Sequence, residues 1–404
     1  MALITLFDKS FLQCLSADES VWFDHFFSPN VCPIFYIETL ADLDKAVREG
    51  RTPEQEVGII ADKFPEIHGT PNIVHNQLVT GELLGFPVDM SGKIILNGRD
   101  LDASRDGMKG HAHYKLSPEA EAFSRWKHRE FLEIEREIAR GWRDSITGVN
   151  LEEVGRQMRE AGVDNTVCKT LADAKELAML TANRTDHPVE MLRLIFLLFE
   201  VPQGAQAEIY MRWQQRGFPP LNRHAPYVCY ALMVELFFRF ALAAHLIAGT
   251  RASHRVDMLY LLYLPFCEVF ASGDKLHRLC APYFMREDQS FAWGLDLKEG
   301  LASINAHYAE LPAELRERGI FVFAGSVPPI DAPHVGLLWD RHRPNWKKHG
   351  DQTIPLTPEL QVKLGELLLK QSDDPRSLSL ERRVAPRRGS WTITPPDLPK
   401  SKDA

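Results

Sequence analysis

Two acidic residues stand where a β-type run ends and a helical segment begins. Asp8 directly follows residues 3–7, LITLF, and Asp274 comes shortly after residues 267–272, CEVFAS. In an open parallel α/β sheet, ligands collect at the carboxyl ends of the strands. The two carboxylates are therefore expected to lie at neighbouring strand ends along one edge of a sheet.

Two further acids lie on segments that flank these strands. Glu38 falls in the first turns of a helix that grows out of the apolar run VCPIFYI, and Asp257 lies near the start of the apolar helical segment HRVDMLYLLYLPF. Four crowded carboxylates repel one another, so without a cation at least one of them should have a raised pKa. Mg²⁺ and Mn²⁺ take oxygen ligands, and such ions activate water for phosphodiester hydrolysis. We therefore expect a metal site that is also catalytic, formed by Asp8, Glu38, Asp257 and Asp274.

Position in the chain predicts a role for each side chain. Asp8 and Asp274 are expected to bind a first ion directly, while Asp257 and Glu38 complete its shell, bind through water or hold a second ion. Ser272 is expected to orient a carboxylate or a metal-bound water. Two lysines next to the acids are candidates for contact with a substrate phosphate, and plain surface lysines are the equal alternative: Lys9 and Lys275.

Each acid also has a purely structural interpretation. Asp8 and Asp274 can cap the helices that follow them, which is a common role of aspartate. Asp257, in the first turn of a helix, suits the helix dipole. Glu38 can pair with a lysine or arginine. Taken singly, these interpretations are favoured; the order of the four acids favours the metal site.

The same segments resemble a known family, the PIN-like nucleases. The resemblance rests on LFDKS, FYIETL, VDMLYLLYLPF and FASGDK, taken in this order, with Ser272 as the small hydroxyl residue, and it covers about the first fifty residues and 250–290. It implies an α/β fold with a parallel sheet flanked by helices and an Mg²⁺- or Mn²⁺-dependent nuclease. RNA is a more probable substrate than DNA by this analogy, with single-stranded or unpaired segments cleaved.

The family resemblance divides the chain. Over two hundred residues separate Glu38 from Asp257, so we expect a PIN-like core that a large helical insertion splits. The insertion is expected to shape substrate access or to bind a regulatory protein. The predicted parts are the core at 1–50 and 250–330, the mainly helical insertion at 51–249, a helical extension at 331–371 and a disordered tail at 372–404.

Local patterns make further predictions inside these parts. Residues 117–145 predict one long helix, whose basic residues are either a solvated face or a wall of a nucleic-acid groove with Trp126 free for base stacking. Residues 71–106 predict strands or a hairpin, and residues 319–330 predict a β-type run. The basic side chains of the long helix that are candidates for substrate contact are Arg125, Lys127 and Arg129.

Composition is that of an ordinary globular protein. Hydrophobic residues make up 45 % of the 404 residues, and the net charge of −8 gives no general attraction to nucleic acid. The six cysteines form no CxxC pair, which favours reduced core residues and a cytoplasmic location. The most apolar stretch carries Glu235, Arg239 and His245, so it predicts a buried helix rather than a membrane span.

A second hypothesis assigns no catalysis. In it the helical middle of the chain is a binding or scaffold surface, and the four acids serve as helix caps and ion-pair partners. Distance separates the two hypotheses, because a nuclease needs Asp8, Glu38, Asp257 and Asp274 to converge.

Overall fold

A parallel β-sheet lies at the centre of the protein. The computed structural model describes residues 2–43, 50, 52–65, 67, 70–95, 100–105, 108–113, 122, 125–126, 130, 132–330, 332–349 and 387–393. Neighbouring strands of the sheet all run parallel, in the order β3-β2-β1-β6-β7. The strands are β1 (Leu3–Phe7), β2 (Phe27–Val31), β3 (Thr70–Pro71), β6 (Val269–Ser272) and β7 (Ser290–Trp293).

Strand β1 lies between a strand from the N-terminal part of the chain and a strand from the C-terminal part. It pairs with β2 on one side and with β6 on the other, in a register that places Leu6 beside Phe270 and Phe7 beside Ala271. β6 is buried along its whole length, as expected for a strand covered by helices on both faces. The fold is therefore mixed α/β with a parallel sheet flanked by helices, which confirms the coarse prediction.

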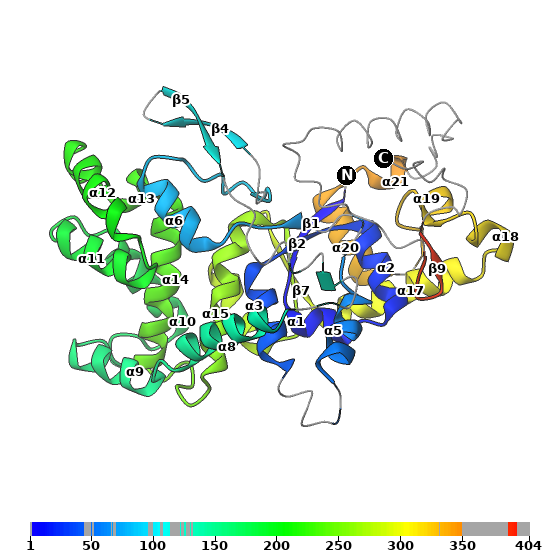
Figure 1. Ribbon diagram of the computed structural model, residues 1–404, viewed down its shortest axis with the longest axis horizontal. Coiled ribbons are helices and arrows are strands. Elements are labelled where there is room, and N and C mark those ends of the chain that lie inside the picture. Colours follow the sequence, from blue (N-terminus) through cyan, green and yellow to red (C-terminus); the bar gives the residue numbers. More distant parts are fainter. Residues whose placement is uncertain are drawn as a thin grey trace.

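Helices from both ends of the chain cover the sheet (Figure 1). An aromatic cluster joins β1 to two of these helices: Phe7 contacts Phe23 and Phe35 edge to face. The helices of these two parts of the chain are α1 (Lys9–Cys14), α2 (Ala17–Phe26), α3 (Pro33–Ala41), α5 (Pro53–Ala61), α15 (Ser253–Tyr260), η1 (Leu261–Phe266), α16 (Lys275–Cys280), η2 (Ala281–Tyr283), α17 (Gly294–Ala309) and α20 (Pro333–His342), with α18 (Ala313–Arg316), α19 (Ile320–Phe323) and α21 (Trp346–His349) farther out.

The middle of the chain forms a second region, mostly helical. Figure 1 shows its green helices gathered on one side of the sheet. Its elements are α6 (His75–Leu83), the antiparallel hairpin of β4 (Asp100–Arg105) and β5 (Met108–His113), α8 (Glu133–Thr147), α9 (Leu151–Glu160), α10 (Leu171–Ala182), α11 (Pro188–Leu198), α12 (Gln203–Gln215), α13 (Leu221–His224) and α14 (Pro226–Ala243).

Helix α14 is the core of this region. Within the described part of the chain it alone is long and apolar enough to cross a membrane, yet most of it is buried inside the protein. Glu235 forms an ion pair with Arg255 at 2.6 Å, and the Val228 amide at the start of the helix donates to Glu82 at 2.9 Å. The prediction of a buried helix is confirmed for this stretch.

Several local predictions were wrong. The hairpin predicted within 71–106 is found in part, because β4 pairs with β5, but residues 75–83 form helix α6. Residues 320–323 form the short helix α19. The long helix predicted over 117–145 is not continuous, because α8 begins at Glu133 after an extended Leu132. Strand β7 was not predicted. The errors at 75–83 and 320–323 came from β-branched and aromatic content, and the error at 117–145 came from helical periodicity; tertiary packing overrides both.

The predicted disorder after residue 372 was wrong for residues 387–393. There, β8 (Arg387–Arg388) and β9 (Trp391–Thr392) form a small hairpin against α2. The Trp391 indole is 2 % exposed and donates to Asn305 at 2.8 Å, while Arg388 forms a buried ion pair with Asp24 at 3.1 Å. One large apolar ring and one paired cation are enough to dock this short segment. The helix predicted over 357–371 lies outside the described residues.

Candidate functional site

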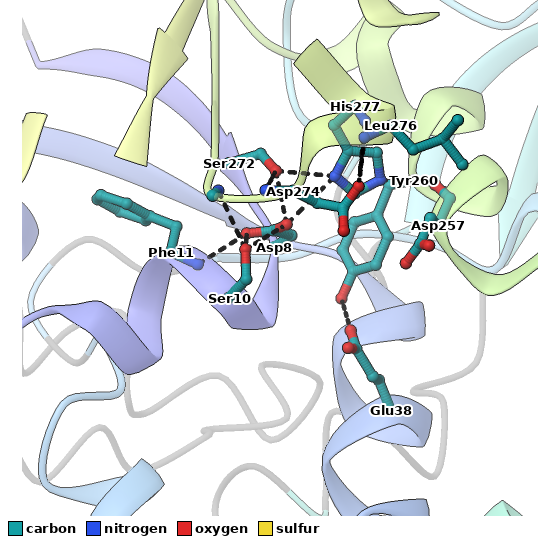
Figure 2. Close-up of polar contacts among 11 residues, drawn as sticks. Asp8, Ser10, Phe11, Glu38, Asp257, Tyr260, Ser272, Asp274, Leu276 and His277 are labelled. Carbon is teal, nitrogen blue, oxygen red and sulfur yellow. Dashed lines mark hydrogen bonds and ion pairs between the residues drawn. The ribbon is translucent and has the colours of Figure 1, made fainter. Parts of the chain in front are cut away.

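The ends of β1 and β6 bring distant parts of the chain together, as Figure 2 shows. Asp8 follows β1, and Ser272 is the last residue of β6. The Ser272 hydroxyl donates to Asp8 Oδ2 at 2.6 Å, across 264 residues of sequence. The Asp8 amide also donates to the Ala271 carbonyl at 3.3 Å, so the strand pairing itself fixes the position of the carboxylate.

The Asp8 carboxylate is buried and its acceptor sites are occupied. It is only 3 % exposed and caps α1, accepting the Phe11 amide at 2.8 Å. The Ser10 hydroxyl lies 2.9 and 2.8 Å from its two oxygens. The capping interpretation of Asp8 is thus confirmed, while its role as a direct metal ligand stays a prediction.

His277, which is 1 % exposed, supplies the charge that balances Asp8. Its Nδ1 lies 3.2 Å from Asp8 Oδ2 and 2.8 Å from Ser272 Oγ, and its Nε2 lies 2.7 Å from the Asp257 carbonyl. Burial lowers the pKa of His277, but the Asp8 carboxylate outweighs it and raises that pKa to about 9. Burial in turn raises the pKa of Asp8, and His277 with Ser272 holds it below its usual range. Asp8 and His277 therefore form a buried ion pair.

Asp274 caps helix α16, as its structural interpretation predicted. Its Oδ1 accepts the Leu276 amide at 2.6 Å and the His277 amide at 3.4 Å. Its own amide donates to Ser272 Oγ at 2.9 Å, so one hydroxyl joins both aspartates. Its second oxygen has no hydrogen-bond partner within the described part of the chain.

Glu38 lies on helix α3 and is linked to the site through Tyr260, as Figure 2 shows. Its Oε2 accepts the Tyr260 hydroxyl at 2.8 Å, whereas a lysine or arginine partner was the predicted structural role. Burial raises the pKa of Glu38, Lys9 opposes this shift and the charge of Asp8 adds to it. Asp8 and Glu38 thus interact electrostatically.

Asp257 is the unusual member of the set. It lies in the second turn of α15 rather than the first, and its carboxylate has no hydrogen-bond or ion-pair partner among the residues that the structure describes. Burial raises its pKa to about 7, opposed by His277 and reinforced by the three neighbouring acids Asp274, Glu38 and Asp8. A carboxyl group in these surroundings needs either a proton or a cation.

The predicted substrate contacts have diverse surroundings. Lys9 is 3 % exposed and pairs with Asp42 at 2.6 Å, so its charge is used inside the protein. Lys275 is exposed at the start of α16. Arg125 forms an ion pair with Glu135.

Trp126, the aromatic residue predicted to stack on bases in a nucleic-acid groove, is buried. Trp126 is 1 % exposed, and its ring stacks on Tyr36 with the ring centroids 5.5 Å apart. The prediction that Trp126 is free to stack on bases was therefore wrong. Lys127 and Arg129 lie outside the described residues.

A fit to a divalent ion depends on the oxygens that remain open. Over the described ranges, no three or more His, Cys, Asp or Glu side chains lie together so that they could hold a metal ion, so the four acids do not converge on one metal shell there. Open carboxylate oxygens belong to Asp257, Asp274 and Glu38. A hydrated Mg²⁺ ion would need fewer protein ligands than a closed metal site, because Mg²⁺ keeps several waters and is usually bound by one or two carboxylates.

Sequence reasoning missed His277 and Tyr260, which hold the acids in place. A signal for His277 exists in the sequence, because it follows Asp274 by three residues and so lies one helical turn away. Its contact with Asp8 spans 269 residues, and no local pattern reports such a pairing.

The chain was also compared with known proteins. No protein-family model, no curated protein and no solved structure matches it.

Proposed function

We propose that the protein is a divalent-metal-dependent nuclease that hydrolyses phosphodiester bonds, with a PIN-like core split by the helical insertion. One observation carries the proposal. Asp257, with a pKa raised to about 7 and no partner in the described part of the chain, shares an electrostatic environment with Asp274, Glu38 and Asp8. A bound cation satisfies such a carboxylate at neutral pH better than any protein group around it.

The residues divide the work between them. Asp257, Asp274 and Glu38 would hold the ion through their open oxygens, directly or through water. Asp8 and His277 position these ligands, since His277 Nε2 contacts the Asp257 carbonyl at 2.7 Å and its amide contacts Asp274. When bound, Mg²⁺ or Mn²⁺ supplies a water of lowered pKa and neutralises charge on the phosphate.

The PIN-like assignment is supported by the order of the parts. The acids follow the first strand, lie on an early helix, lie on a later helix and follow the next strand, and both strands are neighbours in one parallel sheet. The substrate class follows from the family resemblance: RNA, single-stranded or locally unpaired. Among the proposed phosphate contacts that the structure describes, Lys275 is exposed beside the capping Asp274.

The insertion fits a regulatory role. Several of its apolar side chains point to solvent, including Leu197 at 77 % and Leu180 at 58 % exposure, which supports a protein partner on this region. A cytoplasmic location is part of the same proposal, in keeping with six cysteines that form no disulfide.

A non-catalytic scaffold is the second candidate. It is favoured by the fact that Asp8 and Asp274 both cap helices and that Asp8 already has a buried counter-ion. Under this hypothesis the protein shows no cleavage with any ion.

The test is a cleavage assay on fluorescently labelled single-stranded RNA and DNA with Mg²⁺, Mn²⁺ or EDTA. Asp257→Asn and Asp274→Asn are expected to lower the rate at least about 100-fold, the scale on which catalytic groups act. Asp144→Asn, an exposed aspartate of α8, is the matched control and should cleave like the wild type. Wild-type rates in both site variants, or no cleavage by the wild type with either ion, would falsify the proposal.

A further inference from the structure

An arginine and a tryptophan meet beside the carboxylates. Trp293 ends strand β7 and lies in register with Ser272, whose hydroxyl donates to Asp8. Arg278 comes from α16, the helix that Asp274 caps, and its Cζ lies 5.1 Å from the centroid of a Trp293 ring. Two planar groups that stack bases in nucleic-acid complexes are thus placed one strand away from the candidate site.

The charges on this side of the site are not neutralised. Lys275 and Arg278 are both exposed, and neither has a carboxylate partner in the part of the chain that the structure describes. They are three residues apart on α16 and therefore lie on the same face of that helix. By contrast, Arg286 and Arg343 in the same half of the protein form ion pairs with Asp288 and Glu268. Unpaired cations next to a group of acids suit a ligand that carries anions of its own.

A groove continues from Trp293 along the outer edge of β7. It has a volume of about 600 Å³, and α20 forms its far wall. β7 is the last strand of the described sheet, so no further strand occupies this edge. Its lining combines apolar side chains with charges of both signs, from Phe291, Trp293, Leu338, Arg341, Glu287 and Asp296.

We propose that Arg278 and Trp293 bind the nucleotide next to the cleaved phosphodiester of a single-stranded nucleic acid. Trp293 and the guanidinium plane stack on a base, Lys275 and Arg278 contact phosphates, and the groove along β7 receives the nucleotides that follow. This inference rests on the proposed nuclease function and gives the strand a path away from the carboxylates. A duplex does not fit this role, because its bases are stacked on one another and cannot reach the indole.

The test measures binding without cleavage. Fluorescein-labelled oligo-uridine and oligo-thymidine of about 12 nucleotides, within the range that such single-strand sites cover, are titrated with protein in EDTA and followed by anisotropy. Trp293→Leu is expected to weaken binding about ten-fold, the lower part of the range for loss of one base–aromatic stack. Trp293→Phe keeps a ring and should stay within about three-fold of the wild type.

Arg278→Gln tests the charge separately. It should weaken binding and reduce the salt dependence of the binding constant by about one unit, as expected for loss of one phosphate contact. Arg193→Gln, an exposed arginine on α11, is the control and should bind like the wild type. Unfolding of each variant in urea confirms that the surface changes leave the fold intact.

Three outcomes overturn the inference: no binding of either oligonucleotide by the wild type, wild-type affinity of both Trp293→Leu and Arg278→Gln, or an equal loss in Trp293→Phe and Trp293→Leu. These outcomes are distinguishable from failure of the nuclease proposal. Binding that depends on Trp293 without cleavage by the wild type leaves the inference standing and removes the enzyme. Cleavage that depends on Asp257, together with normal binding by Trp293→Leu, supports the enzyme and removes the inference about Trp293.

Discussion

The two halves of the candidate site differ in how their carboxylates are neutralised. The inner half is Asp8 with Ser272 and His277, and the outer half is Asp257, Asp274 and Glu38. In the inner half the carboxylate is 3 % exposed, and His277 holds its pKa below the usual range. In the outer half burial raises the pKa of Asp257 to about 7, and its side chain has no partner among the described residues.

This difference assigns a structural role to the inner half and ligand binding to the outer half. A buried carboxylate with a complete set of donors and a cationic partner is already stable, so Asp8 joins β1, β6 and α16 into one unit. A carboxylate that lacks such partners is stable only with a proton or an external cation. The inner half thus fixes the geometry, and the outer half is the place for a ligand.

The largest effect is expected from His277→Ala, which breaks the inner half. Removing one partner of a buried ion pair leaves the other charge uncompensated, and the free energy of unfolding should fall by about 3–5 kcal/mol. Urea unfolding at pH 7 measures it. His187→Ala, an exposed histidine at the start of α11, is the control. A loss of less than about 1 kcal/mol for His277→Ala would mean that Asp8 does not depend on this partner.

The ion pair also has a pH signature. The pKa of His277 in the folded protein is raised to about 9 from an ordinary value of 6.5. The folded state therefore binds more protons over this range, so the stabilisation is complete below pH 6.5 and is lost as the pH rises through 9. This decline in stability should be absent from His277→Ala.

Asp257→Asn tests the outer half, and here the substitution is expected to stabilise the protein instead of destabilising it. Because the folded-state pKa is raised from 3.8 to about 7, wild-type stability should fall as the pH rises from 4 to 7. Without metal at pH 8, the variant is expected to be more stable than the wild type by about 2 kcal/mol, which is part of the full value of such a shift because the group is partly exposed. Urea unfolding in EDTA at pH 5 and pH 8 measures this.

The same variant should lose its response to metal. Mn²⁺ should raise the stability of the wild type at pH 8 and leave Asp257→Asn unchanged, because a ligand that binds only the folded state stabilises it. A less stable Asp257→Asn protein in EDTA would show instead that Asp257 is a structural partner.

The smallest effect is expected from Tyr260→Phe, which removes one hydrogen bond from Glu38. Loss of the 2.8 Å contact should cost about 1 kcal/mol. It should also raise the pKa of Glu38 further, so that protons compete with Mn²⁺ and affinity at pH 6 falls a few-fold in calorimetry. Tyr308→Phe is a matched control, because it loses a similar bond to the Ser326 carbonyl far from the acids. Equal Mn²⁺ affinity of both variants would show that the Tyr260 hydroxyl does not influence metal binding.

The sequence predicts the parts of the fold whose signals are local. β1 and β6 are short apolar runs, each followed by an aspartate, and both the strands and the helix caps appear as predicted. β7 was missed because its four residues alternate between buried and partly exposed at the edge of the sheet, too short a pattern to be recognised. The tail hairpin was missed because Trp391 is isolated in a polar, proline-rich stretch.

The site was only partly predictable for a related reason. A carboxylate after a strand is visible in the sequence, but what neutralises it is not. Nothing local to Asp8 or Asp257 indicates that the fold places His277 against the Asp8 carboxylate and leaves that of Asp257 without a partner among the described residues. Partners that lie more than two hundred residues apart are decided by topology alone.

That separation has a consequence for how the protein is made. During synthesis β1 and β2 leave the ribosome long before β6, which must pair with β1 across 264 residues. Closing so long a loop is slow, and until it closes an edge of β1 lies open to other chains. The helices of the middle region can fold during this interval and bring the two ends close. A truncated or stalled chain that stops before residue 272 therefore carries Asp8 and Glu38 without their partners and has no assembled site.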